Sequence, residues 1–459
     1  MPTRAAPPTP LAGDGGAGEP PLSPIGLLKT RRLWPLALAQ SCGALNDNLV
    51  KNAMLVLALF QLGIAGTGLS ALAGALFIAP YILLSATAGK LADRFAKPRV
   101  IVACKLAEVA LMAVAAAAFL TGSVPCLLIV LTGLGIQAAL FGPVKYGVLP
   151  EHLSEAELVA GNGVIEATTF LSIVAGTVAG GALILLPHGI AWVSASGIAL
   201  ALLGLWSSLR IPAVPPADPS LRISPNIIGE TWRLVCHAAS VRAIWLAILG
   251  LSWFWTMGAA LLTEFPVIAR DTLHSDGTVL TLLLTVFAVG VGTGSLLCAR
   301  LLHGEISARL VPFAGIGVSV FCWDFASAAL SADTIATAAT ALCSLTGWRM
   351  IVDLFLLAAC GGLFSVPLYA IIQDRAAPAE RARMVAANNV MNALFMVIGA
   401  AATAAAAAIG WGAPRFLQAA AAANLLVALW IMFVVRTLPG QQPSAAPSAA
   451  HRPAGWSRR

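Results

Sequence analysis

Charged residues are scarce in this sequence of 459 residues, where Lys, Arg, Asp and Glu together make up 10%, against roughly 25% in ordinary soluble domains. Hydrophobic residues make up 59%, which is more than a soluble fold of this length can bury. The imbalance runs along the whole chain and excludes a soluble enzyme with a single anchor, a secreted disulfide scaffold and a disordered protein. The period-two alternation of an outer-membrane barrel is also missing. A polytopic helical membrane protein remains.

Several chemical signatures are missing as well. The chain has no G-x-x-x-x-G-K-[ST] loop to hold ATP phosphates, so we expect transport that is secondary or driven by a partner. None of the eight Cys stands in a C-x-x-C spacing, and none of the six His begins the H-x-x-x-x-D pattern of glycerolipid acyltransferases. We therefore expect no metal, disulfide or cofactor, and no enzymatic activity.

Long apolar segments are abundant instead. A helix needs about 20 apolar residues to cross roughly 30 Å of hydrocarbon, and twelve segments of this kind occur. They cover residues 34–60, 67–89, 100–121, 124–145, 158–186, 190–209, 241–267, 278–299, 307–331, 349–373, 384–409 and 414–436. We predict an all-α membrane protein of twelve transmembrane helices in two halves of six.

Composition divides the chain further. Residues 211–240 are polar and rich in Pro, and the two ends are rich in Pro and Ala. We expect one six-helix half at 29–210, a cytoplasmic linker at 211–240, the second half at 241–437, and disordered cytoplasmic tails at 1–28 and 438–459.

The basic residues fall mainly on one side of the predicted spans. Of the 27 Lys and Arg, 22 lie in the regions that are cytoplasmic if the N-terminus is inside, and three lie in the outer loops. This bias predicts that both termini are cytoplasmic. It also accounts for the net charge of +7 through anionic lipid headgroups, without any nucleic acid.

An internal repeat supports the two halves. Residues 158–167 align without gaps on residues 384–393, and matched Phe, Tyr and acidic residues stand just upstream: Phe141, Tyr146 and Glu151 against Phe364, Tyr369 and Asp374. A parallel repeat of six helices is typical of transporters whose halves rock about a central cavity. The alternative is coincidence in an Ala-rich chain.

The loop after the second span reads Gly89-Lys-Leu-Ala-Asp93-Arg94-Phe-Ala-Lys97-Pro-Arg99. It resembles the signature loop of the major facilitator superfamily, at the place where that family requires it. The resemblance implies that Asp93 caps a helix end and pairs with a basic residue to close a cytoplasmic gate with Gly89, Arg94 and Arg99, while Gly89 permits close packing. A solvated loop that only sets topology is the alternative.

The first span contains Asn46-Asp47-Asn48 and Lys51. An ionisable side chain at the bilayer midplane costs roughly 2.5–3.5 kcal/mol on insertion scales, so we interpret Asp47 as a ligand for a coupling cation or a polar headgroup. Asp47 and Lys51 are four residues apart and can partly neutralise each other. The alternative is a pair that only fixes helix packing.

Further polar residues stand in later spans. Asn162 and Glu166 lie on one helical face, close in sequence to Lys145, and Glu264 comes late in the seventh span. The repeat places amides at the corresponding positions of the second half, namely Asn388, Asn389 and Asn392. We predict that these residues line one cavity. Interhelical hydrogen bonding alone, and a snorkelling Lys145, are the alternatives.

Several stretches together resemble the bacterial lysophospholipid transporters of this superfamily, notably Asn46-Asp-Asn48, Gly142-Pro-Val-Lys145-Tyr-Gly, Asn162-Gly-Val-Ile-Glu166-Ala and Gly176-Thr-Val-Ala-Gly-Gly181. The resemblance implies a monomer that moves lysophosphatidylethanolamine from the outer to the inner leaflet of the bacterial inner membrane, where a partner acyltransferase restores the second chain. It also implies that Asp47, Lys145 and Glu166 belong to a charged cavity. Some members carry an Arg in the seventh span, where this chain has Glu264.

Two other functions fit the same sequence. One is a proton-coupled exporter of drugs or small amphiphiles with the same fold, in which Asp47 would carry the proton. The other is a membrane sensor or scaffold that transports nothing, although a scaffold has no need to maintain charges at mid-membrane depth.

Overall fold

The computed structural model describes residues 21–62, 67–332 and 334–437, and every secondary-structure element in the described part of the chain is a helix. Its elements are α1 (Pro24–Leu28), α2 (Trp34–Val56), η1 (Leu57–Gln61), α3 (Thr67–Arg94), α4 (Lys97–Leu120), α5 (Val124–Gly147), α6 (Leu149–His152), α7 (Glu155–Leu183), α8 (Gly189–Ser208), α9 (Ile227–Ser240), α10 (Arg242–Val267), η2 (Ile268–Thr272), α11 (Gly277–Leu301), α12 (Val311–Ser331), α13 (Ala338–Cys343), α14 (Leu345–Arg375), η3 (Pro378–Glu380), α15 (Arg381–Ala408) and α16 (Ala413–Thr437).

The predicted fold class is confirmed. Eleven helices in the described residues are long and apolar enough to cross a membrane. Helix α2 is the twelfth long helix and is more polar, because it carries the Asn46–Lys51 stretch. Each of the twelve begins and ends within a few residues of a predicted span, since the length of an apolar segment is a local property of the sequence.

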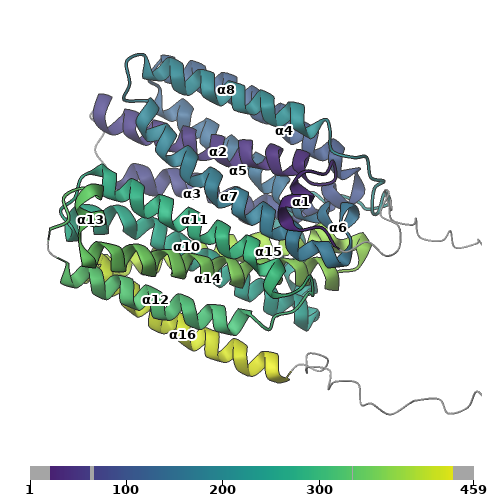
Figure 1. The fold of residues 1–459 in the computed structure, drawn as a ribbon. Helices are drawn as coiled ribbons and strands as arrows, with labels where there is room; N and C mark the ends of the chain where they lie inside the picture. The colour runs from purple at the N-terminus through teal and green to yellow at the C-terminus, as the bar shows by residue number, and fades with distance from the viewer. Residues whose placement is uncertain (1–20, 63–66, 333, 438–459) are drawn as a thin grey trace, which may run out of the picture.

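The twelve long helices lie side by side in two groups (Figure 1). In the first, which comprises α2–α8, α2 packs on α7 and α8, and α4 packs on α5. In the second, which comprises α10–α16, α14 packs on α10, α11 and α12. Helices α7 and α15 carry the two copies of the repeat, and each crosses to the other group: α7 packs on α11, and α15 packs on α3. A parallel repeat produces this kind of reciprocal contact.

One end of the bundle is rich in basic residues, and we call it the basic end. There α3 and α14 end and α4 and α15 begin, so that Lys90, Lys97, Arg381 and Arg383 gather at one level. Helices α1 and α6 lie at this end in Figure 1, whereas α13 lies at the other.

The first predicted tail is partly ordered. Residues 24–28 form α1, which begins after Ser23, whose hydroxyl accepts a hydrogen bond from the backbone N–H of Gly26 at 3.2 Å. Leu27 is fully buried because α1 packs against α7. The expectation of a disordered segment was therefore wrong for residues 24–28, while residues 1–20 and the tail at 438–459 lie outside the described residues.

Close packing of α7 on α2 depends on two glycines one helical turn apart. A Cβ at Gly176 would overlap the carbonyl oxygen of Leu45, and a Cβ at Gly180 would overlap that of Leu49. Small residues at this spacing let two helix backbones approach closely within a membrane. The neighbouring Gly181 is open, since the nearest atom to its Cβ position is 3.9 Å away.

We expect Gly180→Ala to lower the midpoint of thermal unfolding in detergent, because overpacking of a tight contact costs about 1–3 kcal/mol. Gly181→Ala is the matched control and should leave the midpoint unchanged or slightly higher. Intrinsic tryptophan fluorescence during heating measures both. Equal destabilisation by the two substitutions would show that the α2–α7 contact is not the cause.

Candidate functional site: a charged cavity between the two helix groups

A cavity of about 430 Å³ lies between the two groups of helices. Asp47, Asn48 and Lys51 of α2 line it, together with Lys145 of α5. The second group contributes Asn389 and Asn392 of α15 and aromatic rings of α10 and α14. Six of the eleven residues predicted for the cavity therefore line it: Asp47, Asn48, Lys51, Lys145, Asn389 and Asn392.

The polar stretch of α2 divides between the cavity and the helix packing. Asn46 is fully buried and turns away from the cavity, because its Nδ2 donates to Oε1 of Glu108 at 3.0 Å. The Nζ of Lys51 donates to Oδ1 of Asn48 at 3.2 Å. Lys51 and Asp47, which were predicted to pair, form no ion pair within the described residues. The Lys51 ammonium group is hydrogen-bonded to Asn48 instead. One carboxylate oxygen of Asp47, Oδ1, is buried and has no hydrogen-bond partner within the described chain.

A third lysine on the cavity wall is held by a buried acid. The Nζ of Lys105 donates to Oε2 of Glu108 at 2.6 Å, and Glu108 also accepts from Nε2 of Gln137 at 3.3 Å. Lys105 and Gln137 both line the cavity. Neither is among the residues predicted for the cavity, whereas the spacing of three residues on a helix does predict the pairing of Lys105 with Glu108.

Two stacked tyrosines form part of the cavity wall towards the basic end. The rings of Tyr146 and Tyr369, which the repeat matches to each other, lie 4.2 Å apart with an interplanar angle of 8°. The hydroxyl of Tyr146 donates to Oε2 of Glu166 at 3.1 Å, and Nε1 of Trp255 donates to the hydroxyl of Tyr369 at 3.0 Å. Lys145 places its Nζ 4.9 Å from the centre of the Tyr146 ring.

The other predicted cavity residues lie outside the lining. Glu166 is behind Tyr146, and Asn162 exchanges two hydrogen bonds with Gln373 of α14, at 2.6 and 3.1 Å. Asn388 is fully buried beside the lining residue Asn389, and Glu264 is buried beside the lining residue Thr263. Asn162 and Gln373 thus join the two groups directly, and because the residues are 211 positions apart, no local sequence pattern predicts this contact.

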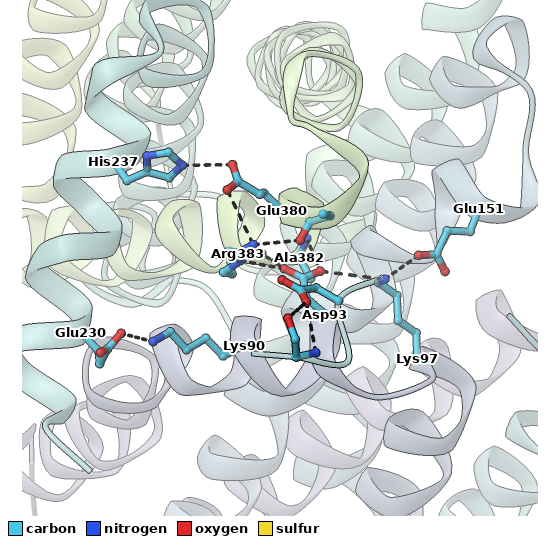
Figure 2. Close-up of polar contacts among 12 residues, drawn as sticks. Lys90, Asp93, Lys97, Glu151, Glu230, His237, Glu380, Ala382 and Arg383 are labelled. Atoms are coloured by element: carbon cyan, nitrogen blue, oxygen red, sulfur yellow. Dashed lines mark hydrogen bonds and ion pairs between the residues drawn. The ribbon is translucent and has the colours of Figure 1, made fainter. Parts of the chain in front are cut away.

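At the basic end the two groups meet through Asp93, the last acidic residue of α3, as Figure 2 shows. We call this cluster of Asp93, Lys97, Glu151, Ala382 and Arg383 the basic-end contact. The fully buried Asp93 carboxylate accepts from Nε of Arg383 at 3.1 Å and from the backbone N–H groups of Ala382 and Arg383 at 3.3 Å each. These N–H groups belong to the first turn of α15, which favours a negative charge.

Lys97 completes the cluster within the first group. Its Nζ lies 3.9 Å from Oδ1 of Asp93 and 2.5 Å from Oε1 of Glu151. Gly89 is required for the close approach of α3 to α15, because a Cβ there would lie 2.8 Å from the Cβ of Ala386. Of the other predicted gate residues, Arg94 stacks over Phe95 and Arg99 is exposed. Neither is among the ion-pair partners of Asp93 in the described residues.

Comparison with known proteins agrees with this arrangement. The profile of the Major Facilitator Superfamily matches residues 36–348, more than half of the chain. The lysophospholipid transporter LplT of Cronobacter sakazakii (strain ATCC BAA-894) is 30% identical over 371 residues, which cover 77% of this chain and 83% of that protein. This chain belongs to the bacterial lysophospholipid transporter family of the major facilitator superfamily.

Other members of the superfamily share the fold. The LplT protein of Serratia proteamaculans (strain 568) is 31% identical over 306 residues, covering 65% of this chain and 69% of that protein. Among solved structures, the human organic anion transporter MFSD10 matches with a TM-score of 0.69 at 14% identity, covering 88% of this chain and 99% of that one. A bacterial homologue of ferroportin, crystallised in an outward-facing state, matches with a TM-score of 0.64 at 14% identity and covers 88% of this chain and 100% of that one.

We expect Asp93→Asn to loosen the basic-end contact of this superfamily transporter. Removing one partner of a buried ion pair costs about 3–5 kcal/mol, because Arg383 then loses the carboxylate to which its Nε donates. In a variant whose only cysteine is Ala382→Cys, alkylation by a water-soluble maleimide should be slow, and Asp93→Asn should accelerate it severalfold.

Glu305→Gln is the control, since Glu305 pairs with Arg309 at 3.4 Å on the exposed surface and such pairs contribute little. Equal labelling rates in the Asp93→Asn variant and its parent would mean that Asp93 does not hold this end closed.

Proposed function

We propose that this transporter moves lysophospholipids such as lysophosphatidylethanolamine across the inner membrane, from the outer to the inner leaflet, by alternating access. The observation that carries the proposal is the charged cavity between the two helix groups, with Asp93 and Arg383 joined across the groups at the basic end. The relatives named as lysophospholipid transporters support the choice of substrate.

The basic end is the cytoplasmic end in this proposal. Of the 27 Lys and Arg, 22 lie in the regions that this orientation puts inside, as the positive-inside rule requires. Asp93, Gly89 and Arg383 then form a cytoplasmic gate, which is closed in this conformation. The cavity is therefore loaded from the outer side.

The cavity walls suit a zwitterionic headgroup. Lys51 and Lys145 line the first group's side and would attract the phosphate. Asp47, with one buried carboxylate oxygen unpartnered, would take the substrate ammonium or a coupling cation. The amides of Asn389 and Asn392 face them from α15 and would hydrogen-bond the glycerol and phosphate oxygens.

We infer a lateral opening for the acyl chain between α3 and α15. Residues 384–393 of α15 are all buried, whereas nearly all of residues 394–408 are exposed or half-buried. The two helices touch at the basic end, where Gly89 meets Ala386. The far half of α15 is not packed in this way, as its exposed residues show. Phe77 and Ile78 of α3 and Met396 of α15 line the cavity at this side, so an acyl chain can remain in lipid while its headgroup occupies the cavity.

We further propose that the chain works as a monomer without a cofactor, has no catalytic role of its own, and hands its substrate to an acyltransferase that restores the second chain. Both termini are cytoplasmic in this proposal.

The central experiment is uptake of labelled lysophosphatidylethanolamine by spheroplasts that express the protein. We expect Asp47→Asn to abolish uptake or its dependence on a sodium or proton gradient, because the variant loses the anionic oxygen in the cavity. Collapsing the two gradients separately identifies the coupling ion. The matched control is Glu305→Gln, which removes a carboxylate from the exposed surface.

Full uptake and unchanged ion dependence in Asp47→Asn would refute the role of Asp47. Protection against toxic amphiphiles by expression, without any lysolipid uptake, would instead favour an exporter.

The lateral opening has its own test. A photoreactive lysophospholipid should form adducts with residues 77, 78 and 396, and excess unlabelled lysophosphatidylethanolamine should suppress them. Phe433 of α16 is 68% exposed on the outer surface of the second group and serves as the control. Adducts there should persist in the presence of competitor, because they report bulk lipid. Adducts at positions 78 and 396 that resist competition would exclude this entry path.

A further inference from the structure

Helix α9, which connects the two groups, presents three distinct faces. Glu230, Leu234 and Ala238 are buried against the bundle. Arg233, His237 and Ser240 are exposed and polar. Ile228, Trp232 and Cys236 form the third face at a spacing of four residues, and Ile228 and Trp232 are 79% and 71% exposed. A helix with adjoining exposed apolar and polar faces is suited to a membrane–water interface.

The apolar face continues into the lipid-facing surface of the transmembrane helices. A groove of about 590 Å³ lies between α3, α5 and the start of α9. Ile227 and Ile228 line it on one side. Leu83 and Ile136, 52% and 38% exposed, are among the lining residues of α3 and α5. These two helices are long and apolar enough to span a membrane, so acyl chains would border the groove.

Helix α9 is tied to both helix groups (Figure 2). Glu230 forms an ion pair with Lys90 of α3. About two turns further on, Nε2 of His237 lies 3.0 Å from Oε2 of Glu380, just before α15. Glu380 in turn lies 3.6 Å from Nη2 of Arg383, the residue that holds Asp93. Helix α9 therefore bridges the two sides of the basic-end contact.

We propose that α9 is an interfacial helix whose Ile228–Trp232–Cys236 face inserts into the cytoplasmic leaflet, with an acyl chain of a leaflet phospholipid in the groove beside Ile227 and Ile228. The occupant is lipid because the groove and the exposed face are continuous with the membrane-facing sides of α3 and α5. Tryptophan is also the residue enriched at this depth.

This anchorage has a mechanical consequence. Leaflet lipid holds α9 against the bundle, and α9 holds Lys90 and Glu380 on the two sides of the basic-end contact. The cytoplasmic leaflet thereby favours the conformation in which this end is closed. This anchorage rests on the proposed orientation of the basic end, and it holds whichever substrate the cavity carries.

A photoreactive amino acid placed singly at positions 228 and 232 tests the insertion. The full-length protein is reconstituted in vesicles of phosphatidylethanolamine and phosphatidylglycerol, illuminated, and examined by mass spectrometry. We expect phospholipid adducts at 228 and 232 with severalfold higher yield than at the control positions 233 and 240 on the polar face. Equal yields on the two faces would overturn the proposal, as would adducts at 228 and 232 to protein instead of lipid.

A second measurement uses a native residue and so avoids a bulky substitution. With Cys236 as the only cysteine, an attached spin label should be more accessible to oxygen, which dissolves in lipid, than to a water-soluble nickel complex. A label on Ser240→Cys, on the exposed polar face, should show the reverse preference. Greater nickel accessibility at Cys236 would place that face in water and refute the insertion.

The consequence for the gate is tested with Ile228→Ser combined with Trp232→Ser. We expect faster maleimide labelling of Ala382→Cys, because α9 loses its lipid anchorage. Leu342→Ser combined with Leu345→Ser removes two exposed apolar side chains from the opposite end and should have no effect. Unchanged labelling in the α9 variant, despite lipid adducts at 228 and 232, would separate lipid binding from the gate and overturn the coupling.

Discussion

The buried carboxylate of Asp93 is the group on which this conformation depends. A charge removed from water needs a nearly complete set of partners, and the donors here come from both halves of the molecule. Lys97 belongs to the same half, whereas Arg383 and the first N–H groups of α15 belong to the other. The Asp93 carboxylate therefore keeps all of its hydrogen-bond donors only while α3 and α15 touch. When the halves separate, water must replace the donors of α15.

Charge is distributed unequally across the cavity. The first half supplies the ionic groups, including Asp47, Lys51 and Lys105, while the second half supplies amides and aromatic rings. Buried charges are costly unless they are locally compensated, and Lys105 is compensated by Glu108 within its own half. A neutral amide such as that of Asn389 can gain or lose hydrogen bonds at a lower cost in free energy than a buried charge can. This division suits a mechanism in which the ionic half recognises the headgroup and the amide half moves over it.

The same pair of helices, α3 and α15, accounts for both the closed end and the proposed lateral opening. Residues 384–393 of α15 pack against neighbouring helices, whereas residues 394–408, which are rich in Ala, are largely uncovered. Motion of α15 about the Gly89–Ala386 contact would change both ends together. Helix α9 adds a third constraint, because it joins Lys90 to Glu380 at the level of the closed end.

The positions of the twelve helices follow from the sequence alone, because the length of an apolar run is a local property that the bilayer thickness selects. The repeat likewise predicted that Tyr146 and Tyr369 are equivalent, and only the tertiary structure stacks them. Sequence could not assign the partner of Asp93, since Arg383 is 290 positions away. Nor could it decide that Glu166 lies behind Tyr146, outside the cavity lining. Those choices depend on how each helix is rotated against its neighbours, which is set by packing between residues distant in the chain.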